Sequence, residues 1–277
     1  MDKTARLAIV GTGNIGRAMA LGLVQSGRFR AGEIILTRRK VERIADLSAQ
    51  GFRTQADNRD AVRRADLVVV AVEPLQLDQV LQEIRQDLEV ARHVLISVVS
   101  GASLHHLARQ VPAGLPIVRA MPNTGIAVGR SMTCLATNSD REDVREKVVS
   151  LFDSVGRALM IDEELMTPAT ALGACGVAFF LRAIRAAAQG GIEIGFHPEE
   201  ALAMAAQTAL GAASLILERD RHPEREIDSV TTPRGCTIAG LNEMEHQGFS
   251  SAMIKGITTS AEKARSLYAG PESPRRP

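Results

Sequence analysis

Near its start, the chain carries a glycine pattern that restricts the folds open to it. A short apolar run, Leu7–Val10, leads into Gly11-Thr12-Gly13-Asn14-Ile15-Gly16, and residues 17–24 have the composition of a helix. A G-x-G-x-x-G turn between a strand and a helix is the fingerprint of a dinucleotide-binding βαβ unit. We therefore expect an α/β fold whose N-terminal part is a doubly wound parallel sheet of the Rossmann type.

Each glycine of the fingerprint has its own expected task. Gly11 permits the tight turn, Gly13 lets the backbone approach a pyrophosphate, and Gly16 lets the helix pack closely on the strand. The free N–H groups at the helix start attract phosphate, which adds Asn14 and Ile15 to the expected cofactor contacts. A glycine-rich turn that serves packing alone is the alternative.

The rest of the chain divides into two parts of different character. Strand-like and helix-like segments alternate up to residue 161, with strands expected at 7–10, 33–37, 66–72, 94–99, 116–120, 132–136 and 158–161. Beyond residue 162 we expect helices only, at 166–189, 198–217, 237–247 and 250–268. This predicts a Rossmann domain at 1–162, a helical domain at 163–269 and a disordered tail at 270–277.

Composition excludes several classes of partner. Hydrophobic residues make up 45% of the 277 residues and the net charge is +1, so a basic surface that tracks nucleic acid is not expected. We recognise no signal peptide and no apolar run of membrane-spanning length, and therefore expect no membrane partner. The three cysteines are widely spaced and the histidines form no ligand pattern. These features predict a cytoplasmic protein without a metal site.

The end of the second expected strand indicates which dinucleotide binds. It reads Thr37-Arg38-Arg39-Lys40, where a fold that prefers NAD would carry an acid for the ribose hydroxyl. Arg38 and Arg39 suit a 2′-phosphate, and Thr37 adds a hydroxyl. We expect NADP(H) to be preferred, with NAD(H) accepted. A solvated basic turn is the alternative.

Two further segments point to a family. They are Arg119-Ala120-Met121-Pro122-Asn123-Thr124, and Thr231-Thr232-Pro233-Arg234-Gly235-Cys236-Thr237-Ile238-Ala239-Gly240-Leu241. With the N-terminal fingerprint, they make the chain resemble the pyrroline-5-carboxylate reductase family over about residues 5–268. The resemblance implies a Rossmann domain followed by a helical substrate-binding and dimerisation domain.

The resemblance also implies an activity and a set of contacts. The activity is NADPH-dependent reduction of a cyclic imino acid, 1-pyrroline-5-carboxylate to L-proline, by a homodimer or a higher multiple. Further cofactor contacts would come from Asn58, Ala71, Val72, Pro74, Met121, Pro122 and Asn123. For Met121, Pro122 and Asn123, a structural proline turn is the alternative.

By the same resemblance, the loop before the helix at Thr237 holds the substrate. Thr237 would lie beside the imine nitrogen, while Thr232, Gly235, Cys236 and nearby N–H groups hold the carboxylate. A protonated imine is already electrophilic, so the enzyme needs positioning more than a strong acid. Simple capping of a helix is the alternative for Thr232 and Thr237.

Several positions depart from the family pattern. They are the segment 173–179, with Gly173-Ala174-Cys175-Gly176-Val177-Ala178-Phe179, and Glu73, Arg185, Gln189 and Arg234. These departures leave open a reductase of a different cyclic imine carboxylate. A non-catalytic NADP(H) sensor is a further alternative. A β-hydroxyacid dehydrogenase is disfavoured, because residues 166–189 contain no lysine for its catalysis.

Overall fold

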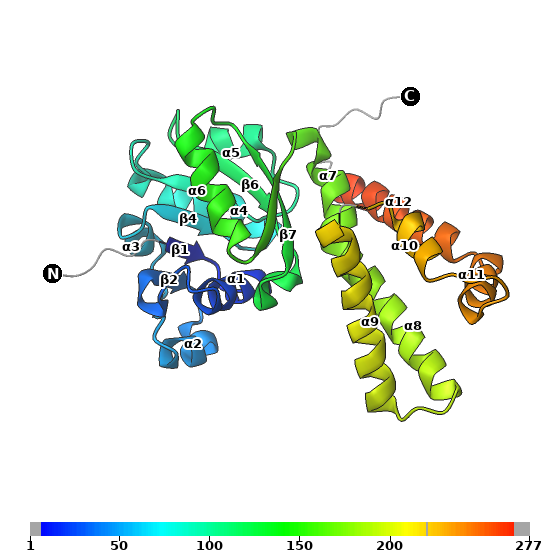
Figure 1. Cartoon of the computed structure of the whole chain (residues 1–277). Helices are drawn as coiled ribbons and strands as arrows, with labels where there is room; N and C mark the ends of the chain where they lie inside the picture. The colour runs from blue at the N-terminus through cyan, green and yellow to red at the C-terminus, as the bar shows by residue number, and fades with distance from the viewer. Residues whose placement is uncertain (1–6, 220, 269–277) are drawn as a thin grey trace. The chain divides into compact units, whose positions relative to one another are not determined.

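The computed structural model describes residues 7–219 and 221–268 (Figure 1). Within them a single sheet has the order β3-β2-β1-β4-β5-β6-β7-β8. Its strands are β1 (Leu7–Val10), β2 (Ile34–Thr37), β3 (Arg53–Gln55), β4 (Leu67–Val70), β5 (Val94–Ser97), β6 (Ile117–Met121), β7 (Ser131–Thr137) and β8 (Gly156–Met160). The expected α/β class and Rossmann-type order are confirmed.

One strand pair departs from the expected parallel sheet. β6 and β7 are antiparallel, whereas every other neighbouring pair is parallel. Only residues 122–130, which contain a short 3-10 turn, Thr124–Val128, separate these two strands. A parallel pair needs a crossover of a dozen residues or more, so this short connection imposes the antiparallel direction.

Both faces of the sheet are covered by helices. In β1, Leu7 and Ile9 belong to one apolar cluster, which contains Phe152 of α6 (Glu142–Asp153). Val10 belongs to a second cluster, which contains Leu81 of α4 (Leu77–Ile84). Alternate residues of a strand point to opposite faces, which explains the division. The buried strands therefore read as continuous apolar runs.

The helices of the described residues vary in length. They are α1 (Asn14–Gln25), α2 (Ala45–Ala49), α3 (Asn58–Arg63), α4 (Leu77–Ile84), α5 (Leu104–Gln110), α6 (Glu142–Asp153), α7 (Met166–Ala169), α8 (Gly176–Glu193), α9 (Pro198–Arg219), α10 (Pro223–Ser229), α11 (Cys236–His246) and α12 (Phe249–Tyr268). A π-helical segment, Thr170–Cys175, connects α7 to α8. No strand occurs in 163–219 or 221–268, as expected.

The chain forms two compact units with a boundary later than residue 162. Among the described residues, one unit contains 7–175 and 260–268, and the other contains 176–219 and 221–259. The segment after 162 stays with the sheet because Met166 is buried in the second apolar cluster. Arg119 of β6 also donates to Glu163, with 2.8 Å between Nη1 and Oε1. The expected tail, 270–277, lies outside the described residues.

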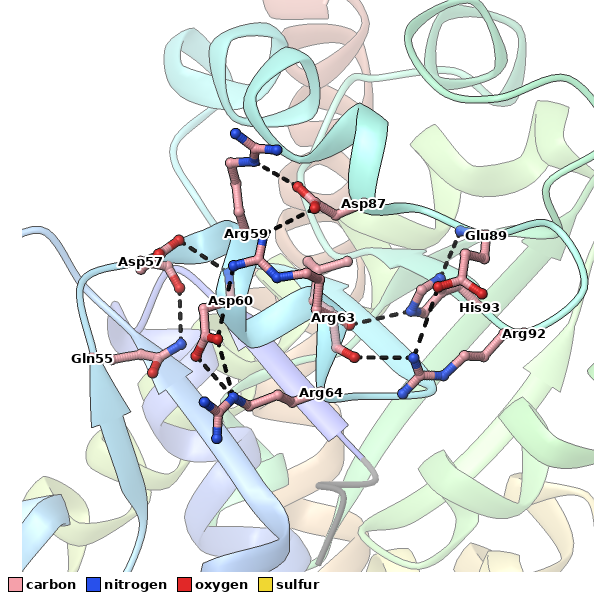
Figure 2. Close-up of polar contacts among 11 residues, drawn as sticks. Gln55, Asp57, Arg59, Asp60, Arg63, Arg64, Asp87, Glu89, Arg92 and His93 are labelled. Carbon is pink, nitrogen blue, oxygen red and sulfur yellow. Dashed lines mark hydrogen bonds and ion pairs between the residues drawn. The ribbon is translucent and has the colours of Figure 1, made fainter. Parts of the chain in front are cut away.

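A polar network fixes α3 against the 3-10 turn Arg85–Asp87, which follows α4 (Figure 2). Asp87 accepts hydrogen bonds from Arg59 Nε at 2.6 Å and from Arg63 Nη1 at 3.0 Å. The hydrogen bond from Arg59 is the main reason that the pKa of Asp87 is lowered, against the opposing effect of burial. Because α3 begins at Asn58, the network also sets the position of a residue in the candidate site.

Candidate active site

The glycine loop has the geometry that its sequence predicts. Gly11 has a φ of +94°, and a Cβ there would lie 2.7 Å from the carbonyl oxygen of Ala71. A Cβ on Gly16 would lie 2.5 Å from the carbonyl oxygen of Gly11, so the helix approaches the loop closely. A Cβ on Gly13 would meet no atom within 4 Å, which leaves open space above the loop. Gly11 and Gly16 thus serve the turn and the packing, and Gly13 leaves room for a ligand.

A cavity of about 590 Å³ opens beside this loop. Seven expected cofactor residues line it: Gly11, Gly13, Arg38, Arg39, Asn58, Ala71 and Val72. Thr37, whose hydroxyl was expected to help, lines it as well. The remaining lining residues were not expected to contact the cofactor, and they are Val10, Thr12, Lys40, Arg43, Glu73, Gln76, Gln79, Val80 and Glu83. They follow strand ends far apart in sequence, so only the folded sheet brings them together.

The cavity has a basic edge and an acidic edge. The basic edge comprises Arg38, Arg39, Lys40 and Arg43. Among the described residues, the side chains of Arg39, Lys40 and Arg43 form no hydrogen bond or ion pair, whereas Arg38 Nη1 donates to the Thr12 carbonyl oxygen at 2.6 Å. Three cations therefore remain free to meet an anion. The acidic edge is formed by Glu73 and Glu83.

The side chain of Thr37 forms hydrogen bonds within the protein. It is 1% exposed, and its hydroxyl donates to Asn58 Oδ1 at 2.6 Å while accepting from the Gly11 N–H at 3.3 Å. Its carbonyl oxygen also accepts from the Thr12 N–H and hydroxyl. Thr37 therefore helps to hold the glycine loop, and a contact from its hydroxyl to the cofactor stays a prediction.

Seven expected cofactor residues do not line the cavity: Asn14, Ile15, Gly16, Pro74, Met121, Pro122 and Asn123. Asn14, Ile15 and Gly16 form the first turn of α1, which has no side-chain cap. Asn123 is 8% exposed; its amide nitrogen donates to the Gly173 carbonyl oxygen, and its Oδ1 accepts from the Gly125 N–H. These bonds favour the structural alternative for Asn123.

The expected substrate loop, residues 231–237, is an exposed turn before α11. The Gly235 N–H donates to the Thr232 carbonyl oxygen at 2.9 Å, and Gly235 is the N-cap of α11. A Cβ on Gly235 would lie 2.5 Å from Thr232 Oγ1, so only glycine permits this approach. Thr232 and Thr237 are exposed, and no hydrogen bond of either hydroxyl occurs among the described residues. The capping alternative is therefore not observed.

Two family models match the chain. One, described as pyrroline-5-carboxylate reductase dimerisation, matches residues 163–267. The other, described as NADP oxidoreductase, coenzyme F420-dependent, matches residues 6–101. The first covers the expected substrate loop and the second covers the glycine loop.

Similarity to a relative extends along the whole chain. Pyrroline-5-carboxylate reductase 2 of Dictyostelium discoideum is 45% identical over 285 residues, which span 97% of this chain and 95% of the relative. The chain belongs to the pyrroline-5-carboxylate reductase family. The resemblance inferred from the sequence motifs is thereby confirmed.

Other pyrroline-5-carboxylate reductases extend the comparison. Pyrroline-5-carboxylate reductase 1 of Dictyostelium discoideum is 52% identical over 274 residues, and these span 95% of this chain but 50% of that relative. The chain thus spans about half the length of this relative. A structure of pyrroline carboxylate reductase from Plasmodium falciparum, solved with NADP bound, has a TM-score of 0.85 at 23% identity. It covers 97% of this chain and 100% of that one, and supports the shared fold.

The segment that matches the reductase dimerisation model exposes a large apolar surface. α8 and α9 lie side by side (Figure 1) and leave large side chains outside, namely Phe180, Leu181, Leu202, Met204, Leu210 and Leu217. Two described helices, 163–193 and Pro198–Arg219, are long and apolar enough to cross a membrane by length and composition alone. The expectation that no apolar run reaches that length is wrong, because small alanines raise the mean hydropathy of both helices.

Proposed function

We propose that the chain is an NADPH-dependent reductase of a cyclic imino acid, with 1-pyrroline-5-carboxylate as substrate and L-proline as product. The observation that carries the proposal is the 45% identity to a pyrroline-5-carboxylate reductase along nearly the whole of both chains. The glycine-loop cavity would hold the cofactor and the expected substrate loop, residues 231–237, would hold the imino acid.

We propose that NADP(H) is preferred and NAD(H) is accepted. The N–H groups at the start of α1 would hold the pyrophosphate beside Gly13. Arg39 and Lys40 would meet the 2′-phosphate, since both are free cations at the cavity edge. The bound cofactor supplies a hydride. The match to an NADP oxidoreductase model supports this assignment.

We propose that the substrate loop orients the imine. Thr237 would hydrogen-bond the imine nitrogen, and Thr232 with the N–H groups of Cys236 and Thr237 would hold the carboxylate. Gly235 would keep the turn narrow enough for these donors to converge. The free hydroxyls support this role, because neither of them caps the helix.

We propose that two copies associate through the helical segment, as a homodimer or a multiple of it. The exposed apolar faces of α8 and α9 support a second copy as the covering partner, since an apolar face of this kind needs burial. The match to a dimerisation model favours this partner over a membrane.

We propose a cytoplasmic location. Cys134, Cys175 and Cys236 are free thiols, which fits a reducing compartment.

A second candidate function is the reduction of a different cyclic imine carboxylate. Arg185 on α8 and Arg234 in the substrate loop favour it, because each is an exposed cation without a partner among the described residues. The two candidate functions share the cofactor and the reaction, and they differ in the ring size or the substituents of the imino acid substrate.

The test is a direct assay of the purified protein. Loss of NADPH absorbance is followed with a panel of five- and six-membered cyclic imino acids. The proposal expects the highest kcat/KM with 1-pyrroline-5-carboxylate. A higher kcat/KM with another cyclic imino acid would support the second candidate. No turnover with any imino acid would leave the non-catalytic NADP(H) sensor as the remaining alternative.

A further inference from the structure

Arg234 has an unusual backbone conformation. Its φ is 60°, and it is the one non-glycine residue with a positive φ in 7–219 and 221–268. This left-handed region brings the Cβ of an L-residue too close to its own backbone, and glycine avoids the penalty. An arginine here is therefore held at a cost to the stability of the fold.

The turn itself gains nothing visible from the arginine side chain. Arg234 is exposed, and its guanidinium forms no hydrogen bond or ion pair within the described part of the chain. The turn is closed by the backbone bond from the Gly235 N–H to the Thr232 carbonyl oxygen. A glycine at 234 would keep that bond, so no contact within the turn explains the arginine.

The charge of Arg234 adds to a positive end of a helix. It lies one residue before Gly235, the N-cap of α11, and the first turn of α11 contains no acid. The uncapped N–H groups of this turn carry a partial positive charge. The guanidinium, the helix end and the free Thr232 hydroxyl thus combine in one small loop that favours an anion.

We propose that Arg234 is a specificity-determining residue that selects cyclic imines carrying a carboxylate over the same rings without one. The inference rests on the proposed function of this loop as the substrate site. Arg234 would pair with the substrate carboxylate, while Thr237 would serve the imine nitrogen. Because Arg234 would contact only the carboxylate, which does not react, its loss should change KM more than kcat.

The experiment compares 1-pyrroline-5-carboxylate with 1-pyrroline, which has the same ring and no carboxylate. Four proteins are assayed: wild type, Arg234→Gly, Arg234→Lys and Arg225→Ala. Arg225 is the matched control, because it is an exposed arginine on α10 whose side chain has no partner among the described residues. KM and kcat are measured for both imines, together with KM for NADPH and the melting temperature.

Arg234→Gly is expected to raise KM for 1-pyrroline-5-carboxylate about fivefold to tenfold, with kcat and KM for NADPH little changed. KM for 1-pyrroline should stay the same, so the preference for the carboxylate shrinks by the same factor. The melting temperature should not fall, because glycine relieves the strained φ. Arg234→Lys should keep most of the preference, and Arg225→Ala should keep all of it.

Two results would overturn the inference. One is an unchanged preference in Arg234→Gly; the other is a loss of preference accompanied by a lower melting temperature, which would assign the arginine a structural role. Failure of the wild type to reduce either imine would instead contradict the proposed function. The two failures are thereby distinguishable.

Discussion

At the scale of residues, the two arginines after β2 have separable tasks. Arg38 donates to the Thr12 carbonyl oxygen and supports the glycine loop, whereas Arg39 is free. Arg39→Ala should raise the Kd for NADPH about tenfold, as expected for loss of one charge-assisted contact at an exposed site, and leave the Kd for NADH unchanged. Arg38→Ala should weaken both cofactors. Calorimetric titration measures all four constants.

Arg28→Ala is the control for this comparison, because Arg28 is exposed and its side chain has no partner among the described residues. It should leave both dissociation constants unchanged. Equal binding of NADPH and NADH by the wild type would contradict the assignment of the basic edge to a 2′-phosphate.

The hydroxyl of Thr237 provides the second prediction at this scale. Thr237→Ala should lower kcat about tenfold to a hundredfold, because its hydrogen bond strengthens as the imine nitrogen becomes an amine. Thr237→Ser keeps the hydroxyl and should retain much of the activity. The Kd for NADPH should not change in either variant. Steady-state kinetics with the best imino acid gives the comparison.

Thr258→Ala is the control, since Thr258 is exposed on α12 and its hydroxyl donates only to its own helix, at the Lys255 carbonyl oxygen. A Thr237→Ala variant that turns over as fast as the wild type would show that the loop is structural.

Residue identity alone predicted some of these roles and missed others. The glycines were predictable because each meets a general backbone requirement. Thr37 was not, because its hydroxyl bonds to Asn58, which lies 21 residues further along the chain. The φ of Arg234 was also hidden, since a left-handed conformation is read from a sequence only where glycine or asparagine marks it.

At the scale of elements, apolar periodicity identified the buried strands and the long helices. It missed β3, α3 and α10, which are short and carry few apolar residues. It also does not show that residues 41–50 divide into a 3-10 turn, Val41–Ile44, and the separate helix α2. Short polar elements depend on tertiary contacts such as the hydrogen bonds of Asp87, and a local sequence pattern does not predict such contacts.

The loop between α4 and β5 contains a buried histidine that predicts a pH dependence (Figure 2). His93 is 1% exposed, accepts from the Glu89 N–H at Nδ1 and contacts the Val62 carbonyl oxygen through Nε2. Burial is the main cause that lowers its pKa below the ordinary 6.5. As the pH falls, His93 therefore binds a proton in the unfolded chain before it does so in the folded chain. Its contribution to the free energy of unfolding is fully present above about pH 6.5 and decreases below that value.

Between about pH 7.5 and about pH 5.5, His93 should remove at most about 1.4 kcal/mol from the free energy of unfolding. Urea titrations at the two pH values measure the loss. His93→Gln should abolish this part of the loss. His105→Gln should retain it, because His105 is exposed on α5 and its side chain has no partner in the described part of the chain. An identical loss in wild type and His93→Gln would contradict the assignment.

At the scale of the whole molecule, the exposed apolar faces predict association. Light scattering at micromolar concentration should give at least twice the 29.7 kDa of one chain. Leu210→Glu on α9 places a charge on the apolar surface and should shift the mass toward one chain. Leu159→Glu on β8 is the matched control, because these leucines are 53% and 50% exposed.

Leu159→Glu should keep the wild-type mass. A wild type that scatters as a single chain would contradict the assembly and would leave the two apolar helices without a covering partner.

The most direct test of the central claim follows the hydrogen that is transferred. NADPH carrying deuterium at its hydride position is incubated with 1-pyrroline-5-carboxylate and the purified protein, and the product is analysed by mass spectrometry. We predict L-proline with one deuterium, on the ring carbon that formed the C=N bond. Proline without the label, or no proline while another cyclic imino acid is reduced, would contradict the account.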